Sequence, residues 1–381
     1  MATFGDIAKG FDYGMNAAAK SFDGNNKYIR ITDIDEVSSQ YLYDDVVSPD
    51  GELEDRYLVK ENDILLARTG ASTGKSYLYR NSDGKLYFAG FLIRANIYKH
   101  NSYFVFSQLH TLRYKKWISV MSARSGQPGI NSQEYASFPV YTTSLQEEDK
   151  IATFLKLLDE RIITQNKIIE KYESLIKGLN DSLYAQYGDD VLTSFSSLGF
   201  SYSGLSGKSA QDFGSGKPFI TYLNVYSNNI INEKDFQYVA IKEGEKQNVV
   251  EYGDVLFTLS SETPEEVGIG SVYLGNENVY LNSFCFGIHI INTKIAFPPY
   301  LSYYVSSTPF RKFIYPYAQG STRFNLCKVD FEKASIKLPS LENQKRIYSI
   351  LSHIESKTET EKSLLDLYNS QKQYLLRQMF I

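Results

Sequence analysis

The loop Gly70-Ala71-Ser72-Thr73-Gly74-Lys75-Ser76 carries the residue types of a phosphate-binding loop. In such loops the glycines let backbone N–H groups surround a nucleotide phosphate, and a lysine follows the last glycine. The spacing differs here, because three residues instead of four separate the first glycine from Gly74-Lys75. An ATP site is therefore disfavoured. We expect instead a positively charged loop that contacts phosphate through Lys75 and free backbone N–H groups.

The other reactive side chains form no catalytic or metal-binding pattern. Cys285 and Cys327 are too few for a disulfide framework and lack the four clustered ligands of a zinc site. Phe297-Pro298-Pro299-Tyr300 comes nearest to the motif with which amino-methyltransferases hold a base, but it lacks the required amide or carboxylate. The four histidines are scattered: His100, His110, His289 and His353. We therefore expect a chain without catalytic residues, metal or cofactor.

Length and composition favour a soluble protein of two or three domains. The chain has 381 residues, and single cores usually stop growing near ~250 residues. No run approaches the roughly 18 apolar residues that a membrane span requires, and the N-terminus has no basic and apolar signal segment. We expect a cytoplasmic protein.

The chain contains one unit twice. Residues 57–65 return as residues 248–256, at an offset of 191, and residues 87–97 return as residues 280–290, at an offset of 193. Residues 114–118 return as residues 310–314, at an offset of 196. Because the order is kept and the offset drifts slowly, the pattern indicates a tandem duplication with short loop insertions.

Each copy is predicted to be an α+β domain followed by a long helix. Short runs rich in Val, Ile, Tyr and Phe predict strands, for example over residues 28–34, 63–68 and 88–98, and residues 103–121 have helical spacing. The predicted segments are a first domain at 1–143, a helix at 144–186, a second domain at 187–339 and a helix at 340–381.

Apolar residues three and four apart form a stripe along each long helix, interrupted at Gln165 in the first and at Thr358, Glu361 and Lys372 in the second. This spacing predicts a heptad seam. Two such helices favour an antiparallel coiled coil with pseudo-twofold symmetry; the alternative is a helix packed on its own domain. A helix of about 35 residues is ~50 Å long, the length of ~15 base pairs of DNA, and would suit two separated half-sites. The seam residues are Ile151, Leu155, Leu158, Ile162, Ile169, Tyr172, Ile347, Leu351, Ile354, Leu365 and Tyr368.

Two long stretches lack acidic residues, although the formal net charge of the chain is -4. Between Asp83 and Glu134, and again between Glu277 and Asp330, there is no carboxylate, while several Lys and Arg remain. We call these stretches the acid-free windows. Such a pattern is typical of a surface that faces DNA phosphates. The alternative is that buried strands and helices carry few charges of either sign.

Each acid-free window ends in a polar loop that contains glycine, at residues 123–131 and 318–325. In the major groove, Arg can pair with guanine, and Gln or Asn can pair with adenine. We expect base contacts from these loops. The alternative role of their polar side chains is to cap the turn before the next element.

In the second copy, Ala-Gln-Gly-Ser-Thr-Arg-Phe-Asn at residues 318–325 is followed by Leu-Pro-Ser-Leu-Glu-Asn-Gln-Lys-Arg-Ile at residues 338–347, which leads into the long helix. With the tandem arrangement, these motifs resemble the specificity subunit of type I restriction-modification systems over the whole chain. The first copy has Thr143 where proline is usual and Glu148 where glutamine is usual.

The resemblance implies a non-catalytic subunit whose two target-recognition domains each bind one half of a split, asymmetric site in double-stranded DNA. Two modification subunits would dock along the helix seams, restriction subunits would join them, and S-adenosylmethionine, ATP and magnesium would bind only to these partners. A fused restriction and modification enzyme is disfavoured by the missing motifs. A stand-alone or DNA-mimicking antirestriction protein is a further alternative, but mimicry would need rows of carboxylates.

The candidate DNA-contacting residues rest on charge, loop position and the repeat. They are Lys20, Arg68, Thr69, Ser72, Thr73, Lys75, Arg94, Lys115, Lys116, Arg124, Gln127 and Asn131 in the first half, and Lys208, Ser209, Ser260, Ser261, Arg311, Lys312, Gln319 and Arg323 in the second.

Overall fold

The computed structural model describes residues 1–123, 126–188 and 190–380. Contacts divide the chain into two compact units, one of Met1–Ile168 with Glu361–Ile381 and the other of Ile169–Thr360. The long helices α5 (Leu145–Tyr187) and α11 (Leu341–Met379) each contribute to both units. The four-segment division expected from the sequence stays a prediction about domains.

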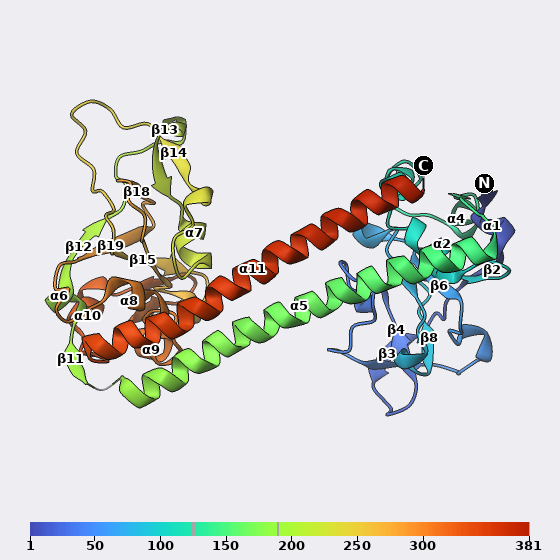
Figure 1. The fold of residues 1–381 in the computed structure, drawn as a ribbon, viewed down its shortest axis with the longest axis horizontal. Coiled ribbons are helices and arrows are strands. Elements are labelled where there is room, and N and C mark those ends of the chain that lie inside the picture. Colours follow the sequence, from blue (N-terminus) through green and yellow to red (C-terminus); the bar gives the residue numbers. More distant parts are fainter. Residues whose placement is uncertain (124–125, 189, 381) are drawn as a thin grey trace. The chain divides into compact units, whose positions relative to one another are not determined.

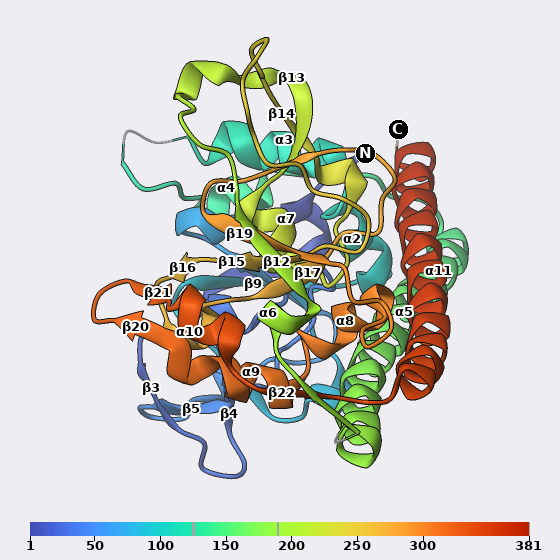
Figure 2. The same cartoon turned by 90° about the vertical axis from the view of Figure 1, so that its left-hand side faces the viewer.

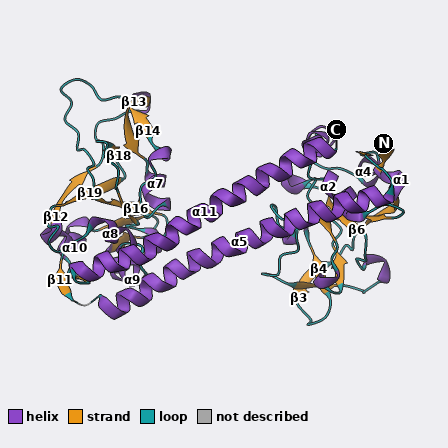
Figure 3. Ribbon diagram, in the orientation of Figure 1, coloured by secondary structure: helices purple, strands orange, loops and turns teal. Residues whose placement is uncertain are grey.

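A four-stranded antiparallel sheet forms the centre of the first unit (Figures 1 and 3). Its Ile64, Leu66 and Ile93 pack with the helices, whereas Leu65 and Leu92 pack with Ile29 and Phe88 in a separate cluster. The alternation of a strand thus gives this sheet two buried faces. In order, the strands are β2 (Ala8–Tyr13), β9 (Leu92–Ile97), β6 (Asp63–Ala67) and β7 (Ser76–Leu78), and the helices are α2 (Ser102–Gln108), α3 (Leu112–Met121) and α4 (Ser132–Ala136).

The second unit repeats this sheet with the same strand order and the same antiparallel pairing. Buried Asp63 and Asp254, 191 residues apart, each accept a backbone hydrogen bond from the residue three before, and burial raises the pKa of both carboxyl groups. The duplication is therefore confirmed in the fold. In order, the strands are β12 (Gly199–Ser203), β19 (Cys285–Ile290), β15 (Val255–Thr258) and β17 (Gly270–Val272), and the helices are α8 (Pro298–Tyr304), α9 (Thr308–Ile314) and α10 (Lys328–Lys333).

Shorter elements complete each unit. The first has β1 (Ala2–Thr3), α1 (Phe4–Ile7), β3 (Ala18–Ser21), β4 (Lys27–Ile29), β5 (Val47–Asp50), β8 (Leu86–Phe88) and β10 (Pro139–Val140). The second has β11 (Val191–Thr193), α6 (Phe195–Leu198), β13 (Phe213–Ile220), α7 (Tyr222–Ser227), β14 (Gln237–Val239), β16 (Ser260–Ser261), β18 (Tyr280–Leu281), β20 (Ala318–Gly320), β21 (Phe324–Leu326) and β22 (Ile336–Leu338).

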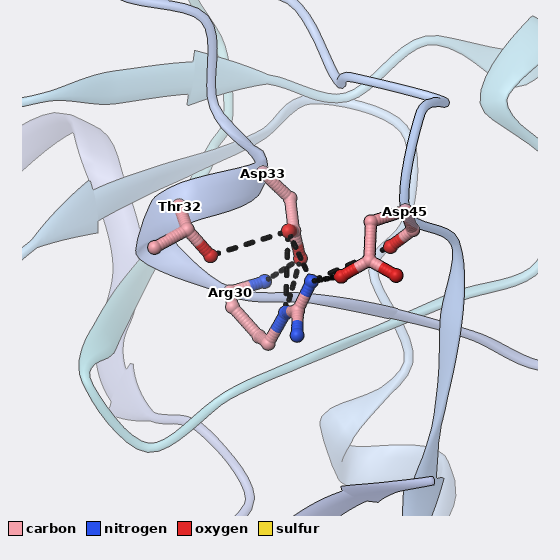
Figure 4. Close-up of polar contacts among 4 residues, drawn as sticks. All are labelled: Arg30, Thr32, Asp33 and Asp45. Atoms are coloured by element: carbon pink, nitrogen blue, oxygen red, sulfur yellow. Dashed lines mark hydrogen bonds and ion pairs between the residues drawn. The ribbon is translucent and has the colours of Figure 1, made fainter. Parts of the chain in front are cut away.

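The strand predicted over residues 28–34 is wrong beyond Ile29, because the chain turns there into a 3-10 helix over Ile31–Asp33. Arg30 explains the turn. Its Nε and Nη2 donate to the two carboxylate oxygens of Asp33 at 2.9 and 2.7 Å, and Nη2 also donates to Asp45 at 2.9 Å (Figure 4). The hydrogen bond to Asp33 also raises the pKa of Arg30, so this guanidinium is committed inside the unit.

Two further predicted elements are each split by a turn. The helical stretch 103–121 breaks between α2 and α3, where the Thr111 side chain accepts a hydrogen bond from the backbone of Tyr114 and starts the second helix. The strand over 88–98 breaks between β8 and β9, where the backbone N–H of Leu92 donates to the carbonyl of Ala89 at 2.9 Å. Gly90 and Phe91 form the corner of this turn.

The two long helices pack together in antiparallel order, as predicted. In the first unit, Leu155 of α5 shares a core with Leu376 of α11, and in the second unit Ile347 and Leu351 of α11 pack with Leu183 of α5. Figure 1 shows the green α5 and the red α11 side by side. The heptad seam therefore packs against the chain itself.

Three of the four polar interruptions of the seam are paired between the two helices, and the fourth, Thr358, donates its hydroxyl to Ile354 of its own helix. Gln165 donates to the Glu361 carboxylate at 2.5 Å and to its backbone carbonyl at 3.2 Å, and Lys372 lies 2.6 Å from the carboxylate of Asp159. Gln165 and Glu361 occupy equivalent positions of the duplication, 196 residues apart. A contact between a residue and its own equivalent is expected where two copies of a helix cross in antiparallel register.

The first turn of each long helix is anchored by an equivalent buried side chain. Gln344 accepts from the backbone N–H of Phe297 at 2.7 Å and donates to the carbonyl of Pro339 at 2.9 Å. Glu148 accepts from the backbone N–H groups of Asn101 at 2.9 Å and Thr143 at 3.2 Å. Thr143 and Glu148 stand where the second copy has Pro339 and Gln344, and the two differences compensate each other. Thr143 has a backbone N–H that a proline lacks, and the Glu148 carboxylate accepts its hydrogen bond.

We expect Glu361→Ala to destabilise the protein. The Gln165 amide is buried at the seam. The variant removes the carboxylate acceptor and leaves only the backbone carbonyl of residue 361, which should lower the free energy of unfolding by about 1 kcal/mol. Urea denaturation followed by circular dichroism measures the change. Asp366→Ala, at an exposed position of the same helix, is the control and should stay near wild type. Equal midpoints for the two variants would contradict the role of this pair.

Candidate nucleic-acid interface

Two loops meet at the end of β6 in the first copy and at the end of β15 in the second. We call residues 68–75 and 259–268 the strand loops, and residues 126–131 and 318–326 the window loops. In the first copy, Gly70 N–H donates to Pro128 and Ile130 N–H donates to Arg68, both at 2.9 Å. In the second copy, Leu326 N–H donates to Leu259 at 2.8 Å, and β16 pairs with β21. Candidate residues predicted from separate segments are thus brought together.

The window loops present polar side chains to solvent. In the second copy the loop is a hairpin of β20 and β21, visible in Figure 2, in which Gln319 pairs with Asn325. Gln319 and Arg323 are exposed, as is Gln127 in the first copy. Asn131 is also exposed, but its side chain caps α4 by accepting from the backbone of Glu134 at 2.9 Å. The predicted Arg124 lies outside the described residues.

The expectation of free backbone N–H groups in the first strand loop is wrong for four of its residues. Gly70, Thr73, Gly74 and Lys75 donate their N–H groups to carbonyls of Pro128, Gly70, Ala67 and Ser72, at 2.9–3.1 Å. The loop therefore closes on itself and on the window loop. Lys75 is half-buried, and its ammonium lies 2.7 Å from the exposed carboxylate of Glu36. Thr69 and Ser72 are half-buried, and Thr73 donates its hydroxyl to Gly70.

A helix fastens each strand loop from beneath. Tyr114 of α3 donates its hydroxyl to the carbonyl of Gly74 at 3.1 Å, and Arg311 of α9 donates to the carbonyl of Gly268 at 2.6 Å. Lys115 and Lys116 on α3 and Lys312 on α9 are exposed beside these contacts. The two copies thus place exposed ammonium groups on equivalent helices.

Several predicted contact residues bind within the protein. Arg311 also donates to the carbonyls of Glu265 and Val267 at 2.7 Å, and burial lowers its pKa to about 10, so it stays protonated at neutral pH. Arg94 donates to Asp12 at 2.7 Å, and Lys208 donates to Glu245 at 2.7 Å. Arg94 and Lys208 are thus paired with carboxylates, and the hydrogen bonds of Arg311 are taken up by backbone carbonyls.

Four more candidates have local partners. The exposed Lys20 lies 3.6 Å from Asp50. Ser209 donates its hydroxyl to Asp212 at 2.8 Å. Ser260 and Ser261 are buried in β16, and Ser261 donates to Glu266 at 2.9 Å.

The first copy has a cationic and aromatic cluster that sequence reasoning missed in part. The Arg68 guanidinium lies 5.0 Å from the ring centre of Tyr13 and 6.0 Å from that of Phe91. A hydrogen bond from Ser132, with smaller help from Arg68, lowers the pKa of Tyr13. Within the described residues, the buried Nε of Arg68 has no hydrogen-bond partner. The three side chains line a hollow of about 760 Å³, which suits a planar ring.

Tyr13 had no sequence signal, whereas Phe91 had one in the repeat. Phe91 and Phe284 are equivalent at the offset of 193, and both are exposed, at 60% and 57%. The equivalent of Arg68 in the second copy is Leu259. The two copies thus keep the exposed phenylalanine and differ beside it.

The chain itself covers much of the seam. Leu155, Ile162, Ile169, Ile347 and Leu351 are buried by the chain itself, and the other predicted seam residues, Ile151, Leu158, Tyr172, Ile354, Leu365 and Tyr368, are half-buried. The five buried side chains would reach a partner only if the helices separated, whereas the half-buried ones are partly accessible. Docking through the long helices stays a prediction.

Other apolar side chains of the long helices do face solvent. Phe154 and Leu157 on α5 are 45% and 60% exposed and border a shallow hollow of about 510 Å³. Ile350 on α11, the equivalent of Phe154, is 38% exposed. Each copy thus presents an apolar position near the start of its long helix.

Within residues 1–123, 126–188 and 190–380, no three side chains of His, Cys, Asp or Glu gather as a metal site would require. No helix in these ranges combines the length and the apolar content of a membrane span.

Comparisons with known proteins agree with the duplicated architecture. Residues 4–174 and 206–367 match the model of the type I restriction modification DNA specificity domain. The crystal structure of a type I restriction-modification system S subunit from M. genitalium is similar, with 14% identity, a TM-score of 0.60, and coverage of 100% of this chain and 95% of that one. A chain from a study of complex assembly and conformational transition of the type I R-M system has 15% identity, a TM-score of 0.56, and 97% coverage of both chains. At these identities the two structures support the fold.

We expect Arg311→Ala to destabilise the protein much more than Lys312→Ala. The first variant leaves the carbonyls of Glu265, Val267 and Gly268 without their charged donor, which should cost about 2 kcal/mol or more. The second removes an exposed ammonium and should change the free energy of unfolding by less than about 0.5 kcal/mol. Thermal unfolding of the two variants measures the difference. Similar melting temperatures would show that Arg311 is no structural clamp.

Proposed function

Because the chain belongs to the family of type I restriction-modification DNA specificity domains, we propose that it selects the DNA sequence on which partner subunits act. Each copy would bind one half of a split, asymmetric site in double-stranded DNA. The observation that carries the proposal is that the two copies share one scaffold but present different side chains from paired loops. A shared scaffold with different loop residues suits two different half-sites.

Within this proposal, the contacts divide by chemistry. The exposed Lys115, Lys116 and Lys312 would bind phosphates, which gives affinity without sequence information. Gln127, Gln319 and Arg323 would read base edges, because amide and guanidinium groups form paired hydrogen bonds with adenine and guanine. Arg94, Lys208, Arg311, Ser260 and Ser261 are left out, because their contacts inside the protein or their burial already account for them.

Members of this family are generally non-catalytic, and we infer the same role here. S-adenosylmethionine, ATP and magnesium would bind to the modification and restriction subunits. The closed strand loop supports this assignment, since four of its N–H groups are engaged with carbonyls and its lysine lies beside Glu36. A subunit that directs the modification of genomic DNA would work in the cytoplasm.

Two modification subunits would dock on the exposed apolar positions of the long helices, one near Phe154 and Leu157 and one near Ile350. These side chains lie on the long helices outside the buried seam, so docking leaves the seam intact. The equivalent positions of Phe154 and Ile350 in the two copies account for two partners per chain. Restriction subunits would join this assembly.

We expect Leu157→Asp with Phe154→Asp to reduce the number of modification subunits from two to one per chain, because charges replace the apolar contact of one site. Ile350→Asp should remove the other subunit. The mass of the co-purified complex measures the stoichiometry. Leu192→Asp, at a 71% exposed leucine outside the long helices, is the matched control. Two bound subunits in every variant would contradict this docking surface.

We expect cells that co-express this chain with its modification subunit to acquire methyl-adenine in both halves of one split motif, detectable by single-molecule sequencing of genomic DNA. Gln319→Ala with Arg323→Ala should relax the second half only, since each lost base pairing costs about 1–3 kcal/mol of discrimination. The first half of the motif is the internal control. An intact complex without new methylation would contradict the proposed function.

A further inference from the structure

The turns at residues 89–92 and 282–285 are built alike in the two copies. In each, the N–H of the last residue donates to the carbonyl of the first, from Leu92 to Ala89 at 2.9 Å and from Cys285 to Asn282 at 3.0 Å. Phe91 and Phe284 occupy the third position. The carbonyl of each phenylalanine also accepts from the first residue of its strand loop, at 3.1 Å from Arg68 and 2.9 Å from Leu259.

A glycine closes each turn from the other side. Gly14 N–H donates to Leu92 at 3.1 Å and Gly204 N–H donates to Cys285 at 3.2 Å. A Cβ on Gly14 would lie 2.2 Å from the carbonyl oxygen of Ala89, and one on Gly204 would lie 2.0 Å from that of Asn282. Both copies therefore hold the backbone of the turn at a distance that only glycine permits.

The rigid turn presents its phenylalanine to solvent. The side chains of Phe91 and Phe284 are 60% and 57% exposed, although their flanking residues differ between the copies. A single exposed aromatic residue needs no explanation. Two at equivalent positions, each on a backbone fixed from two sides and bonded to a strand loop, indicate a shared use.

The charge beside the first turn favours nucleic acid as the partner, because the Arg68 guanidinium lies 6.0 Å from the ring centre of Phe91. Both turns lie inside the acid-free windows of the sequence, although the strand loop bonded to the second turn carries the exposed Glu262 and Glu265. Each is also hydrogen-bonded to the strand loop that meets the window loop of its copy. The proposed protein partners would dock on the long helices.

We propose that Phe91 and Phe284 are wedge residues, each of which inserts its ring into the base stack of duplex DNA beside one half-site. Apolar side chains inserted between base steps unstack them in part and kink the duplex. The wedge supplies no base identity by itself, because every base has an apolar face. The wedge fixes the position of the window loop along the DNA duplex, and the neighbouring side chains then read the base sequence. This inference rests on the proposed function.

The experiment uses the complex of the full chain with its modification subunits and a duplex that contains the methylated motif. Single thymines in and beside the motif are replaced by 5-iodouracil, which cross-links under long-wavelength ultraviolet light to aromatic rings stacked on it, and mass spectrometry then identifies the modified residues. We expect adducts on Phe91 for positions at one half and on Phe284 for positions at the other. Adducts confined to other residues, with both phenylalanines unmodified, would overturn the proposal.

Variants test the energetic share of each ring. Phe91→Ala and Phe284→Ala should each weaken binding of the motif duplex about ten- to hundredfold, as expected for the loss of one stacked aromatic ring, while Phe91→Leu and Phe284→Leu retain most of the affinity as smaller wedges. Phe22→Ala, at a 41% exposed phenylalanine of the first unit, is the matched control. Thermal unfolding confirms that the variants are folded.

The outcomes separate this proposal from the one on which it rests. If the wild-type complex shows no preference for the motif duplex over a scrambled duplex, the proposed specificity function fails. If the wild-type preference is present and the two alanine variants bind like wild type, the wedge alone is wrong. Cross-links from Phe91 or Phe284 to a modification subunit instead of DNA would likewise overturn it and make the turns a protein contact.

Discussion

The structure depends on one constraint: each long helix has a single apolar seam, and the chain supplies the partner for that seam from its own duplicate. Gln165 meets Glu361 at equivalent positions, so the helices pack in the one register that pairs these polar groups. A shift by one turn would bury both without partners, at a cost of several kcal/mol. The domains are tied to this register through Glu148 and Gln344, whose hydrogen bonds fasten the start of each helix to its own globular part.

Duplication explains which features are shared and which differ. The shared features are those that hold backbone in place: the sheet order, the buried carboxylates of Asp63 and Asp254, the close approaches of Gly14 and Gly204, and the helix that fastens each strand loop. The differing features lie on the loops that these elements support. Arg68 of the first copy corresponds to Leu259 of the second, and the second window loop is a hairpin. Because loops contribute little to the core, their residues can change without loss of the fold.

The repeat, the sheet-forming runs and the heptad seams could be predicted from the sequence because each is a periodic pattern of apolar residues. Turns inside such runs were missed. The stretch 88–98 reads as one strand, since Phe, Leu and Ile favour strands on both sides of Gly90, and only the hydrogen bond from Leu92 to Ala89 places the corner. The positions of charged residues predicted DNA contacts less well than the apolar pattern predicted helices and strands. Arg94 and Arg311 were candidates for phosphate contact, but a residue type does not reveal whether a carboxylate or three carbonyls already satisfy it.

The binding of several cations inside the protein bears on how a chain with a net charge of -4 can bind DNA. Once the internally bound cations are set aside, six exposed lysines remain in the described parts of the two windows, namely Lys85, Lys99, Lys115, Lys116, Lys294 and Lys312. Phosphate binding scales with the number of cations that displace counterions, and a handful gives only modest affinity at physiological salt. The remaining free energy must come from contacts that do not depend on net charge, namely base-edge hydrogen bonds and stacking, or from the partner subunits. A specificity subunit gains from this division, because weak phosphate binding keeps its affinity for unrelated sequences low.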